Sequence, residues 1–376
     1  MSLELRLTVS SRIRQASFAR RVLTHCILAV ALLAFMQPRA RGVDTPPPDL
    51  RAWFSEAQLL FDNDTWAKTD RYYTNGFKFG GAVHLGNIWG PLRAPAAAVF
   101  GLRHREQRPE ALGGIFIGQN MYTPRQIGDP RPQPFDRPWA AWLYLGTVLQ
   151  IVQPNEEALD SVEFDIGMVG PAALGKEVQT KVHEIFGART PRGWHNQIPN
   201  EPGFLIAYVH KEKVGNDTVD VVPHAGVTLG TVLTLARVGA TARFGRNLTG
   251  FGPDRIEPSG ALLQNTRSSA QRQARPPLEY YAFAAADLRY VAYNIFLDGT
   301  VFRDSPSVDK RHYVHDLSAG VSMRYGAFRF TIARVHRSEE FTTPLGGGGS
   351  QSFYALGLAY EPGPPARGQN ATTPDK

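Results

Sequence analysis

The stretch SVEFDIGM, at residues 161–168, alternates polar and apolar side chains with a period of two. Phe164 and Ile166 share one face, opposite Glu163 and Asp165. This alternation predicts a β-strand, because successive side chains of a strand point to opposite sides. A strand with one apolar face and one face that carries carboxylates does not border an ordinary core on its charged side. We therefore expect the charged side to be wet, as in the lumen of a membrane barrel.

Similar segments of about ten residues recur along the chain, separated by Gly, Pro, Asn and Asp, as in membrane barrels. They are Trp53–Phe61, Gly76–Leu85, Gly114–Met121, Ala141–Ile151, Phe204–Lys211, Val219–Leu235, Thr231–Phe244, Tyr280–Tyr293, Asn294–Phe302, Leu317–Tyr325, Ala327–Val335 and Phe353–Tyr360. Together they predict an all-β fold, a transmembrane antiparallel β-barrel of about 12 strands. A soluble β-sandwich with one solvated face is the alternative.

One segment departs from the strand pattern. Residues 173–186 carry apolar side chains at helical spacing, and Gly187 is placed to end a helix. Gln179 and His183 are four residues apart in this segment and would share one helix face. We expect a short helix in a loop or in the lumen, away from the lipid face.

The N-terminus is typical of an exported protein. An apolar run at residues 22–36 follows several arginines and precedes Ala40, which predicts a signal peptide at 1–40, with a membrane anchor as the alternative. The barrel domain is then expected at 41–360, followed by a disordered tail at 361–376. Cys26, the single cysteine, lies inside the predicted signal, so the mature chain would need no disulfide.

The basic charge of the chain lies largely in this predicted signal. The formal net charge is +7, and removal of the six arginines and one glutamate of residues 1–40 would leave about +2. No concentrated Lys/Arg stripe interleaved with aromatics remains to neutralise phosphates. The composition therefore argues against a nucleic-acid partner.

Oxygen-bearing side chains are dense after the first predicted strand. The chain reads Phe61-Asp62-Asn63-Asp64, and TDRYYTNG follows at residues 69–76. Carboxylates and amides supply the hard oxygen ligands that calcium prefers, although the spacing fits no EF-hand loop. Asp and Asn before a glycine are also common turn residues, so a plain turn is the alternative reading.

Six blocks of sequence together resemble the lipid A 3′-O-deacylase family of Gram-negative outer membranes. The blocks are Asn63-Asp64 with TDRYYTNG (69–76), GQNMYTP (118–124), DRPWAAWLY (136–144), VQTKVH (178–183) and GWHNQIPNEPG (193–203). They follow one another in order over roughly residues 55–210. The strands after 210 resemble the family mainly in pattern.

The resemblance implies a twelve-stranded barrel with its active site between the barrel wall and the lumen, near the outer leaflet. It implies a calcium-dependent esterase in which His183 is the general base with Gln179 one turn before it, and Thr74 lines the site. Asn63 and Asp64 would bind or organise Ca²⁺. Glu201 would be a metal ligand or would orient the base. The expected partners are lipid A or lipopolysaccharide as substrate and the surrounding outer-membrane lipid, with a monomeric protein in the outer membrane.

The residue types suit this chemistry. An imidazole can take the proton of an attacking water near neutral pH, and a bound cation can polarise the ester carbonyl. No G-x-S-x-G sequence occurs in the chain, so a serine acyl-enzyme is not indicated. His195 is the competing histidine, which we interpret as a loop residue. Arg137 and Lys78 are candidates for contacting the phosphates of lipid A.

Two other functions remain open at this stage. The first is a barrel that serves as a pore, in which the polar lumen residues only conduct ions or fill space. The second is a different calcium-dependent lipid esterase such as an outer-membrane phospholipase, which would want a serine and a histidine on adjacent strands facing the lumen.

Overall fold

The computed structural model describes residues 54–64, 71–85, 110–153, 157–253, 255–256, 276–344 and 348–362. The predicted signal peptide at 1–40 and almost all of the predicted tail at 361–376 lie outside these residues. The chain divides into two compact units. Residues 49–181 with 189–376 contain the barrel, and the second unit includes the described residues 182–188.

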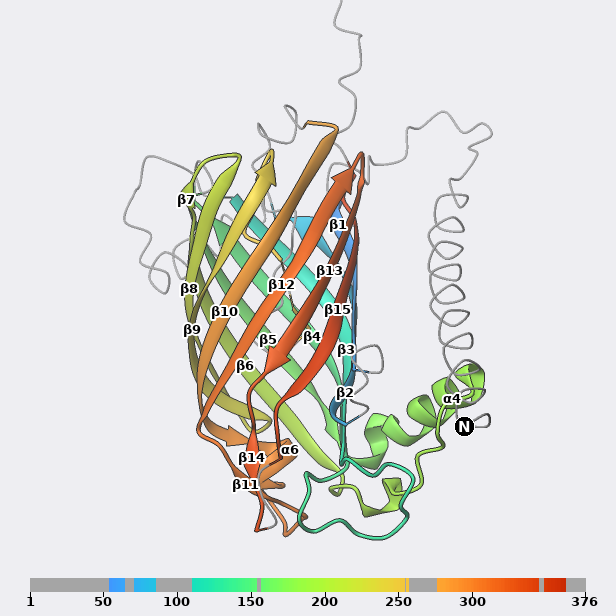
Figure 1. Cartoon of the computed structure of the whole chain (residues 1–376). Coiled ribbons are helices and arrows are strands. Elements are labelled where there is room, and N and C mark those ends of the chain that lie inside the picture. The colour runs from blue at the N-terminus through green and yellow to red at the C-terminus, as the bar shows by residue number, and fades with distance from the viewer. Residues whose placement is uncertain are drawn as a thin grey trace, which may run out of the picture. The chain divides into compact units, whose positions relative to one another are not determined.

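Twelve long antiparallel strands of the described residues close into a barrel (Figure 1). In sheet order they are β6 (Glu201–Glu212), β5 (Ala158–Val169), β4 (Ala140–Val152), β3 (Glu110–Thr123), β2 (Tyr72–His84), β1 (Phe54–Asn63), β15 (Gln351–Tyr360), β13 (Phe328–Arg337), β12 (Tyr313–Tyr325), β10 (Leu278–Asn294), β9 (Leu233–Arg246) and β8 (Val219–Gly230). β6 also pairs with β8, which closes the sheet. A closed sheet leaves no strand edge for lipid to satisfy, so the predicted fold class is confirmed.

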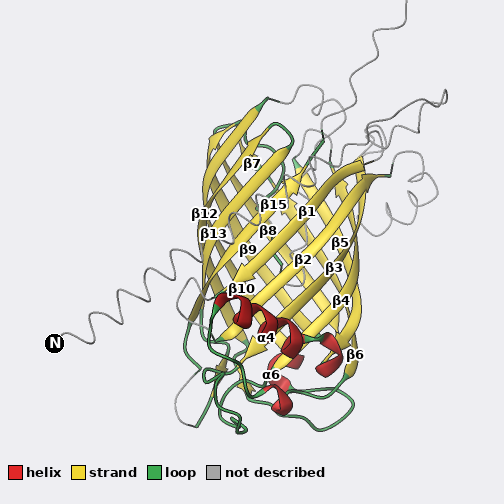
Figure 2. Ribbon diagram, turned by 90° about the vertical axis from the view of Figure 1, so that its right-hand side faces the viewer, coloured by secondary structure: helices red, strands yellow, loops and turns green. Residues whose placement is uncertain are grey.

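Short elements occupy the two ends of this barrel. The two-residue β7 (Val214–Gly215) extends the sheet beside β8, at the end where β1 begins and β15 ends. We call this the terminal end. The opposite end, the loop end, carries a small ribbon of β11 (Asp309–Lys310) and β14 (Phe341–Thr342), together with the helix α6 (Ile295–Asp298) (Figures 1 and 2). None of the described helices is long and apolar enough to cross a bilayer.

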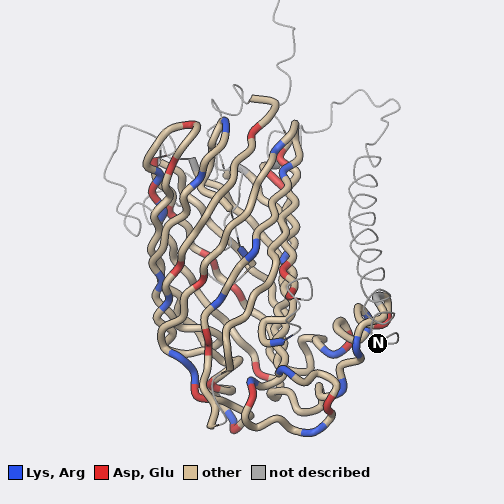
Figure 3. Tube along the Cα trace, in the orientation of Figure 1, with Lys and Arg blue, Asp and Glu red and all other residues tan. Residues whose placement is uncertain are grey.

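The strands alternate as the sequence predicts. Phe164 and Ile166 are 41% and 55% exposed on the outside, whereas Glu163 and Asp165 face inward. The expectation that the charged side is wet is wrong, because Glu163 and Asp165 are 2% and 0% exposed. Lysine and arginine side chains of other strands share the lumen with these carboxylates. Lys78 Nζ, for example, donates to Glu163 Oε1 at 2.8 Å. Figure 3 shows acidic and basic residues along the strands as well as in the loops.

An aromatic cluster fills the lumen toward the loop end. Tyr122 stacks on Phe296 with ring centroids 4.1 Å apart, and Trp142 stacks on Tyr144 at 4.0 Å. Tyr73 meets Phe353 edge to face at 5.0 Å. Rings from the neighbouring strands β15, β2, β3 and β4 and from α6 thus occupy this part of the lumen, where a pore would need open space.

The strand predicted at Asn294–Phe302 is wrong. The segment turns into the helix α6 and then a loop. The Asn294 side chain accepts from Phe296 N at 3.0 Å, and Asp298 Oδ2 accepts from Asn294 N at 2.7 Å. Asparagine at the N-cap satisfies an open backbone donor of the helix, which local alternation of hydrophobicity does not reveal.

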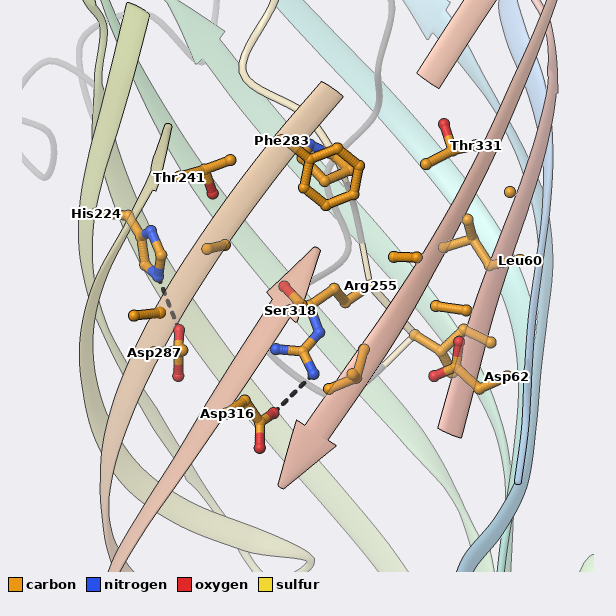
Figure 4. Close-up of a pocket in the computed structure, with 18 of the residues that line it drawn as sticks. Leu60, Asp62, His224, Thr241, Arg255, Phe283, Asp287, Asp316, Ser318 and Thr331 are labelled. Carbon is orange, nitrogen blue, oxygen red and sulfur yellow. Dashed lines mark hydrogen bonds and ion pairs between the residues drawn. The ribbon is translucent and has the colours of Figure 1, made fainter. Parts of the chain in front are cut away.

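Part of the connection between β9 and β10 enters the lumen from the terminal end, and we call it the plug. Arg243 holds it by donating to the carbonyls of Thr249 (3.2 Å), Gly250 (3.0 Å) and Gly252 (3.3 Å). Arg255 Nη2 donates to Asp316 Oδ2 at 2.7 Å (Figure 4). The described residues Pro253, Arg255 and Ile256 therefore lie among the inward side chains of β12 and its neighbours.

We expect deletion of this plug to open the barrel. Replacing residues 249–276 with a short turn removes Pro253, Arg255 and Ile256, which line the cavity in the lumen. In planar lipid bilayers the wild type should show no steady conductance, and the deletion variant should show discrete single-channel currents. A wild type that conducts as well as the deletion variant would contradict the assignment of a plug and would favour the pore.

Candidate active site

Three of the predicted site residues meet at the loop end of β1 and β2. Leu60 and Asp62 of β1 line a cavity in the lumen. Because strand side chains alternate, Asn63 belongs to the outward series, the set of residues whose side chains point away from the lumen. Asn63 is paired in register with Asn75 of β2. Asp64 follows directly, and its backbone N donates to Thr74 O at 3.3 Å. The structure thus brings Asn63, Asp64 and Thr74 together, as the resemblance implies.

Thr74 sits at an irregularity in the sheet. The register between β2 and β3 shifts between Tyr73 and Asn75, which gives Thr74 an extra position on its strand. Its hydroxyl Oγ1 lies 2.6 Å from Thr123 Oγ1. Thr123 continues the outward series of β3 that includes the exposed Ile115 and Ile117. The bulge therefore aims the Thr74 hydroxyl at the outer side of the wall.

The predicted helix forms, with a break near its start. The 3-10 turn η4 (Pro171–Ala173) leads into α4 (Gly175–Phe186), and Leu174 between them has a left-handed φ of 60°. Both elements belong to the connection between β5 and β6, so the helix forms in a loop, as expected. Gly187, at φ 63°, follows the last helical residue, as predicted.

The beginning of this helix packs on the outward face of β3 and β4, which differs from the expectation that it would avoid that face. Gln119 Nε2 of β3 donates to Ala173 O at 2.6 Å. Ala173, Trp194, Met121 and Ala141 form one buried cluster. A Cβ on Gly175 would lie 2.5 Å from the Cβ of Ala141, so only glycine permits this close approach.

Gln179 is held by a residue from another block. Its Oε1 accepts from Trp194 Nε1 at 2.7 Å, and Gln179 is 2% exposed. Gln179 Nε2 has no hydrogen-bond partner among the described residues. A buried amide donor without a partner is costly unless a ligand or water completes it. Gln179 therefore holds Trp194 through Oε1 and keeps Nε2 as a donor for a ligand. The sequence reasoning did not predict its partnership with Trp194.

His183 lies in the second compact unit, among its described residues 182–188. It is 8% exposed, and its carbonyl accepts from Ala188 N at 2.9 Å, which caps the end of α4. His195, the competing histidine, is exposed in the 3-10 turn η5 (Trp194–Asn196). The choice of His183 over His195 as the base therefore stays a prediction.

Glu201 lies apart from the other predicted site residues. It begins β6 in the inward series, opposite the exposed Phe204 and Ile206. Its two carboxylate oxygens accept from Val301 N at 2.8 Å and Phe302 N at 3.1 Å. Glu201 thus anchors the loop after α6, and the structure does not bring it together with Asp64.

We expect Glu201→Gln to weaken the fold slightly without changing any dependence on calcium. The amide keeps one oxygen acceptor, but its NH2 group cannot accept from the second backbone N–H, which costs about 1 kcal/mol at a partly exposed loop. Thermal unfolding should show a lower Tm, whereas the calcium concentration at half-maximal activity should match the wild type. A rise in that concentration would restore Glu201 as a metal ligand.

Few oxygen donors gather where calcium would bind. Among the described residues, no three His, Cys, Asp or Glu side chains form a group that could bind a metal. Asp64 and Asn63 do offer side-chain oxygens beside the hydroxyls of Thr74 and Thr123. These are the hard donors that calcium accepts, with a single carboxylate. The chemistry of this smaller set fits the ion, and Glu201 is not part of it.

The two predicted phosphate contacts are buried elsewhere. Lys78 faces the lumen, where it is paired with Glu163. Arg137 is fully buried, and its Nη1 donates to Glu340 Oε2 at 3.1 Å. Neither side chain is available to a lipid at the surface, so the structure contradicts this prediction.

The closed barrel, its exposed apolar outer belt and its filled lumen define a transmembrane β-barrel protein of the outer-membrane type. The sequence matches the family described as "Outer membrane protein LpxR" over residues 27–355. The chain therefore belongs to the LpxR family, and its place is the outer membrane.

One solved structure agrees with the fold. The chain is similar to LpxR from Salmonella typhimurium, with a TM-score of 0.65 and 21% identity, over 82% of this chain and 100% of that one. The translocator domain of the autotransporter NalP from Neisseria meningitidis is matched at a TM-score of 0.40 and 9% identity, over 91% and 98% of the two chains. No curated protein sequence matches the chain.

Proposed function

We propose that this protein is an outer-membrane esterase that hydrolyses the 3′-linked acyloxyacyl chain of lipid A. The observation that carries the proposal is the meeting of Asn63, Asp64 and Thr74 at the loop end of the barrel, in the outward series of the wall. Longer loops of such barrels face the outside of the cell. A site there meets the outer leaflet, where an ester of lipid A would lie beside the wall.

His183 acts in this proposal as the general base. It would take a proton from the attacking water, the role that an imidazole most often has in general base catalysis. The assignment rests on the resemblance of the VQTKVH block, in which Gln179 precedes His183 by one turn. The free Nε2 donor of Gln179 would bind an oxygen of the water or the ester.

Asn63 and Thr74 would position the ester, and Asp64 with Asn63 would bind Ca²⁺. A bound calcium ion supplies positive charge where the carbonyl oxygen becomes an oxyanion. Thr74 would orient the acyl chain through its hydroxyl, which the Thr74–Thr123 contact holds in place. Glu201 takes no part in this arrangement, because backbone N–H groups occupy both of its oxygens.

The two alternatives are less well supported. A pore is disfavoured by the aromatic cluster and by the plug that Arg243 and Arg255 hold in the lumen. A phospholipase with a serine and a histidine would need such a pair in the lumen. The pair of His336 and Ser352, 3.1 Å apart on β13 and β15, lies on the outward face. In the lumen, His224 hydrogen-bonds to Asp287 at 2.8 Å (Figure 4).

Mass spectrometry of lipid A tests the proposal. Lipid A would be extracted from Gram-negative cells that express this chain and from cells with the empty vector. We expect loss of a mass equal to one acyloxyacyl unit only in the first sample. Unchanged lipid A, with the folded barrel present in the outer membrane, would refute the deacylase and favour a different lipid substrate.

A further inference from the structure

We propose that Arg71 and Arg125 form a subsite that binds a phosphate group of the lipid substrate and positions its sugar headgroup beside the active site. This inference rests on the proposed function for the identity of the lipid. The subsite itself rests on the convergence of two arginines from different loops at the loop end of the barrel.

The two guanidinium groups approach the same backbone position, Gly349. Arg71 precedes β2, and Arg125 follows β3. The position that a Cβ atom on Gly349 would take lies 3.9 Å from Nη2 of each arginine. Gly349 has a φ of 77°, a backbone conformation that glycine adopts readily. A bare glycine backbone thus borders the point where the two charges converge.

Neutral groups hold both arginines in place. Arg71 Nη2 donates to Ser350 O at 3.2 Å, and Arg125 Nη2 donates to Tyr72 Oη at 2.9 Å and to Gly348 O at 3.3 Å. The Tyr72 hydroxyl in turn donates to Gly348 O. A guanidinium has five N–H donors. These contacts therefore fix the two side chains and leave other N–H donors of each guanidinium for a ligand.

Neither guanidinium forms an ion pair with a carboxylate of the described residues. Asp136 is near Arg125, but its two oxygens accept from the backbone N atoms of Arg125 and Arg137, at 2.9 and 2.8 Å. Glu339 accepts from Gly349 N at 3.0 Å, and Arg311 already pairs with it at 2.6 Å. The two positive charges therefore remain available to an anion.

The subsite adjoins the proposed active site through the backbone. Arg71 N donates to Asp64 Oδ2 at 2.6 Å, so the residue that carries one phosphate contact also braces the proposed calcium ligand. Lipid A carries phosphates on its sugar rings, close to its acyl esters. Two guanidinium forks suit a phosphate, which accepts several hydrogen bonds at once.

The experiment compares two lipids and three variants of the full-length barrel in detergent micelles. The lipids are bisphosphorylated lipid A and the same lipid A with both phosphates removed. The variants are Arg71→Ala, Arg125→Ala and the control Arg131→Ala. Arg131 lies in the same loop as Arg125, but its charge is already matched by Asp129 at 2.7 Å, and its hydrogen bond lowers the pKa of Asp129 to about 2. Isothermal titration measures binding, and product release measures KM and kcat.

We expect Arg71→Ala and Arg125→Ala each to weaken binding of the bisphosphorylated lipid about ten-fold, as loss of a charge-assisted hydrogen bond does. KM should rise to match, with kcat nearly unchanged. Binding of the dephosphorylated lipid should be the same in all proteins, and Arg131→Ala should behave as the wild type. Inorganic phosphate at millimolar concentration should compete weakly, because it lacks the acyl chains.

Three results would overturn the proposal. Equal weakening for both lipids would show that the arginines only support the loops. No weakening in either variant would show that the phosphate binds elsewhere, and inorganic phosphate that binds as tightly as the lipid would make the site one for free phosphate. Arginine-dependent binding of the phosphorylated lipid without any deacylated product would leave the subsite intact and refute the deacylase instead.

Discussion

Replacement of His183 by alanine should abolish deacylation of lipid A, with a fall in kcat of about 10²–10⁴-fold, the usual contribution of a general base. Without the imidazole, no group near neutral pKa takes the proton of the attacking water. Binding of lipid A should change little, because the base acts mainly in the transition state. The measurement is release of the acyloxyacyl product by purified protein in micelles.

His195→Ala is the matched control for this prediction. It removes an exposed histidine from a neighbouring loop and should retain full activity. Gln179→Ala should also lower kcat, but it breaks the contact with Trp194 and will lower Tm as well. If His183→Ala is folded and deacylates as fast as the wild type, the assignment of the base is wrong.

Removal of calcium should have a comparably large effect. Chelation is expected to stop deacylation almost completely, and added Ca²⁺ should restore it, because the oxyanion loses the charge that stabilises it. Asp64→Asn should raise the calcium concentration needed for half-maximal activity about ten-fold or more, since it removes the carboxylate of the set. Calcium titrations of activity and of intrinsic tryptophan fluorescence would measure both.

Two controls separate this metal effect from a loss of fold. Glu201→Gln should follow the wild-type calcium titration, since its oxygens bind backbone N–H groups. Mg²⁺ should restore little activity, because it demands a tighter octahedral site than these few oxygens offer. Full activity of the wild type in chelator would contradict the requirement for calcium. Another positively charged group would then have to stabilise the oxyanion.

The local pattern of the sequence was sufficient for the barrel. A membrane strand must turn alternate side chains toward lipid, so the period-two pattern of segments such as 161–168 is imposed at every strand. The helix that ends before Gly187 was also predictable from local sequence, because the spacing of its apolar residues and its C-terminal glycine involve only neighbouring residues. The strand predicted at Asn294–Phe302 failed where a capping side chain overrode the hydrophobic pattern.

The candidate site was predicted in part. The ordered blocks from Asn63 to Glu201 identified the family and brought Asn63, Asp64 and Thr74 to attention, and these three residues do meet. Thr123 was missed as a partner of Thr74, although it lies inside the quoted GQNMYTP block. A bulge at Thr74 decides that contact, and a bulge depends on the register of two strands.

By itself, the sequence determined the class of fold, the number of strands, the helix and the family, because each of these follows from short-range periodicity or from ordered motifs. Only the tertiary structure decided which charges are buried and which are free. Lys78 and Arg137 looked available, yet lumen carboxylates pair with both, whereas Arg71 and Arg125 converge from separate loops. Whether a charge finds a partner depends on residues far away in the chain, which are brought near only when the barrel closes.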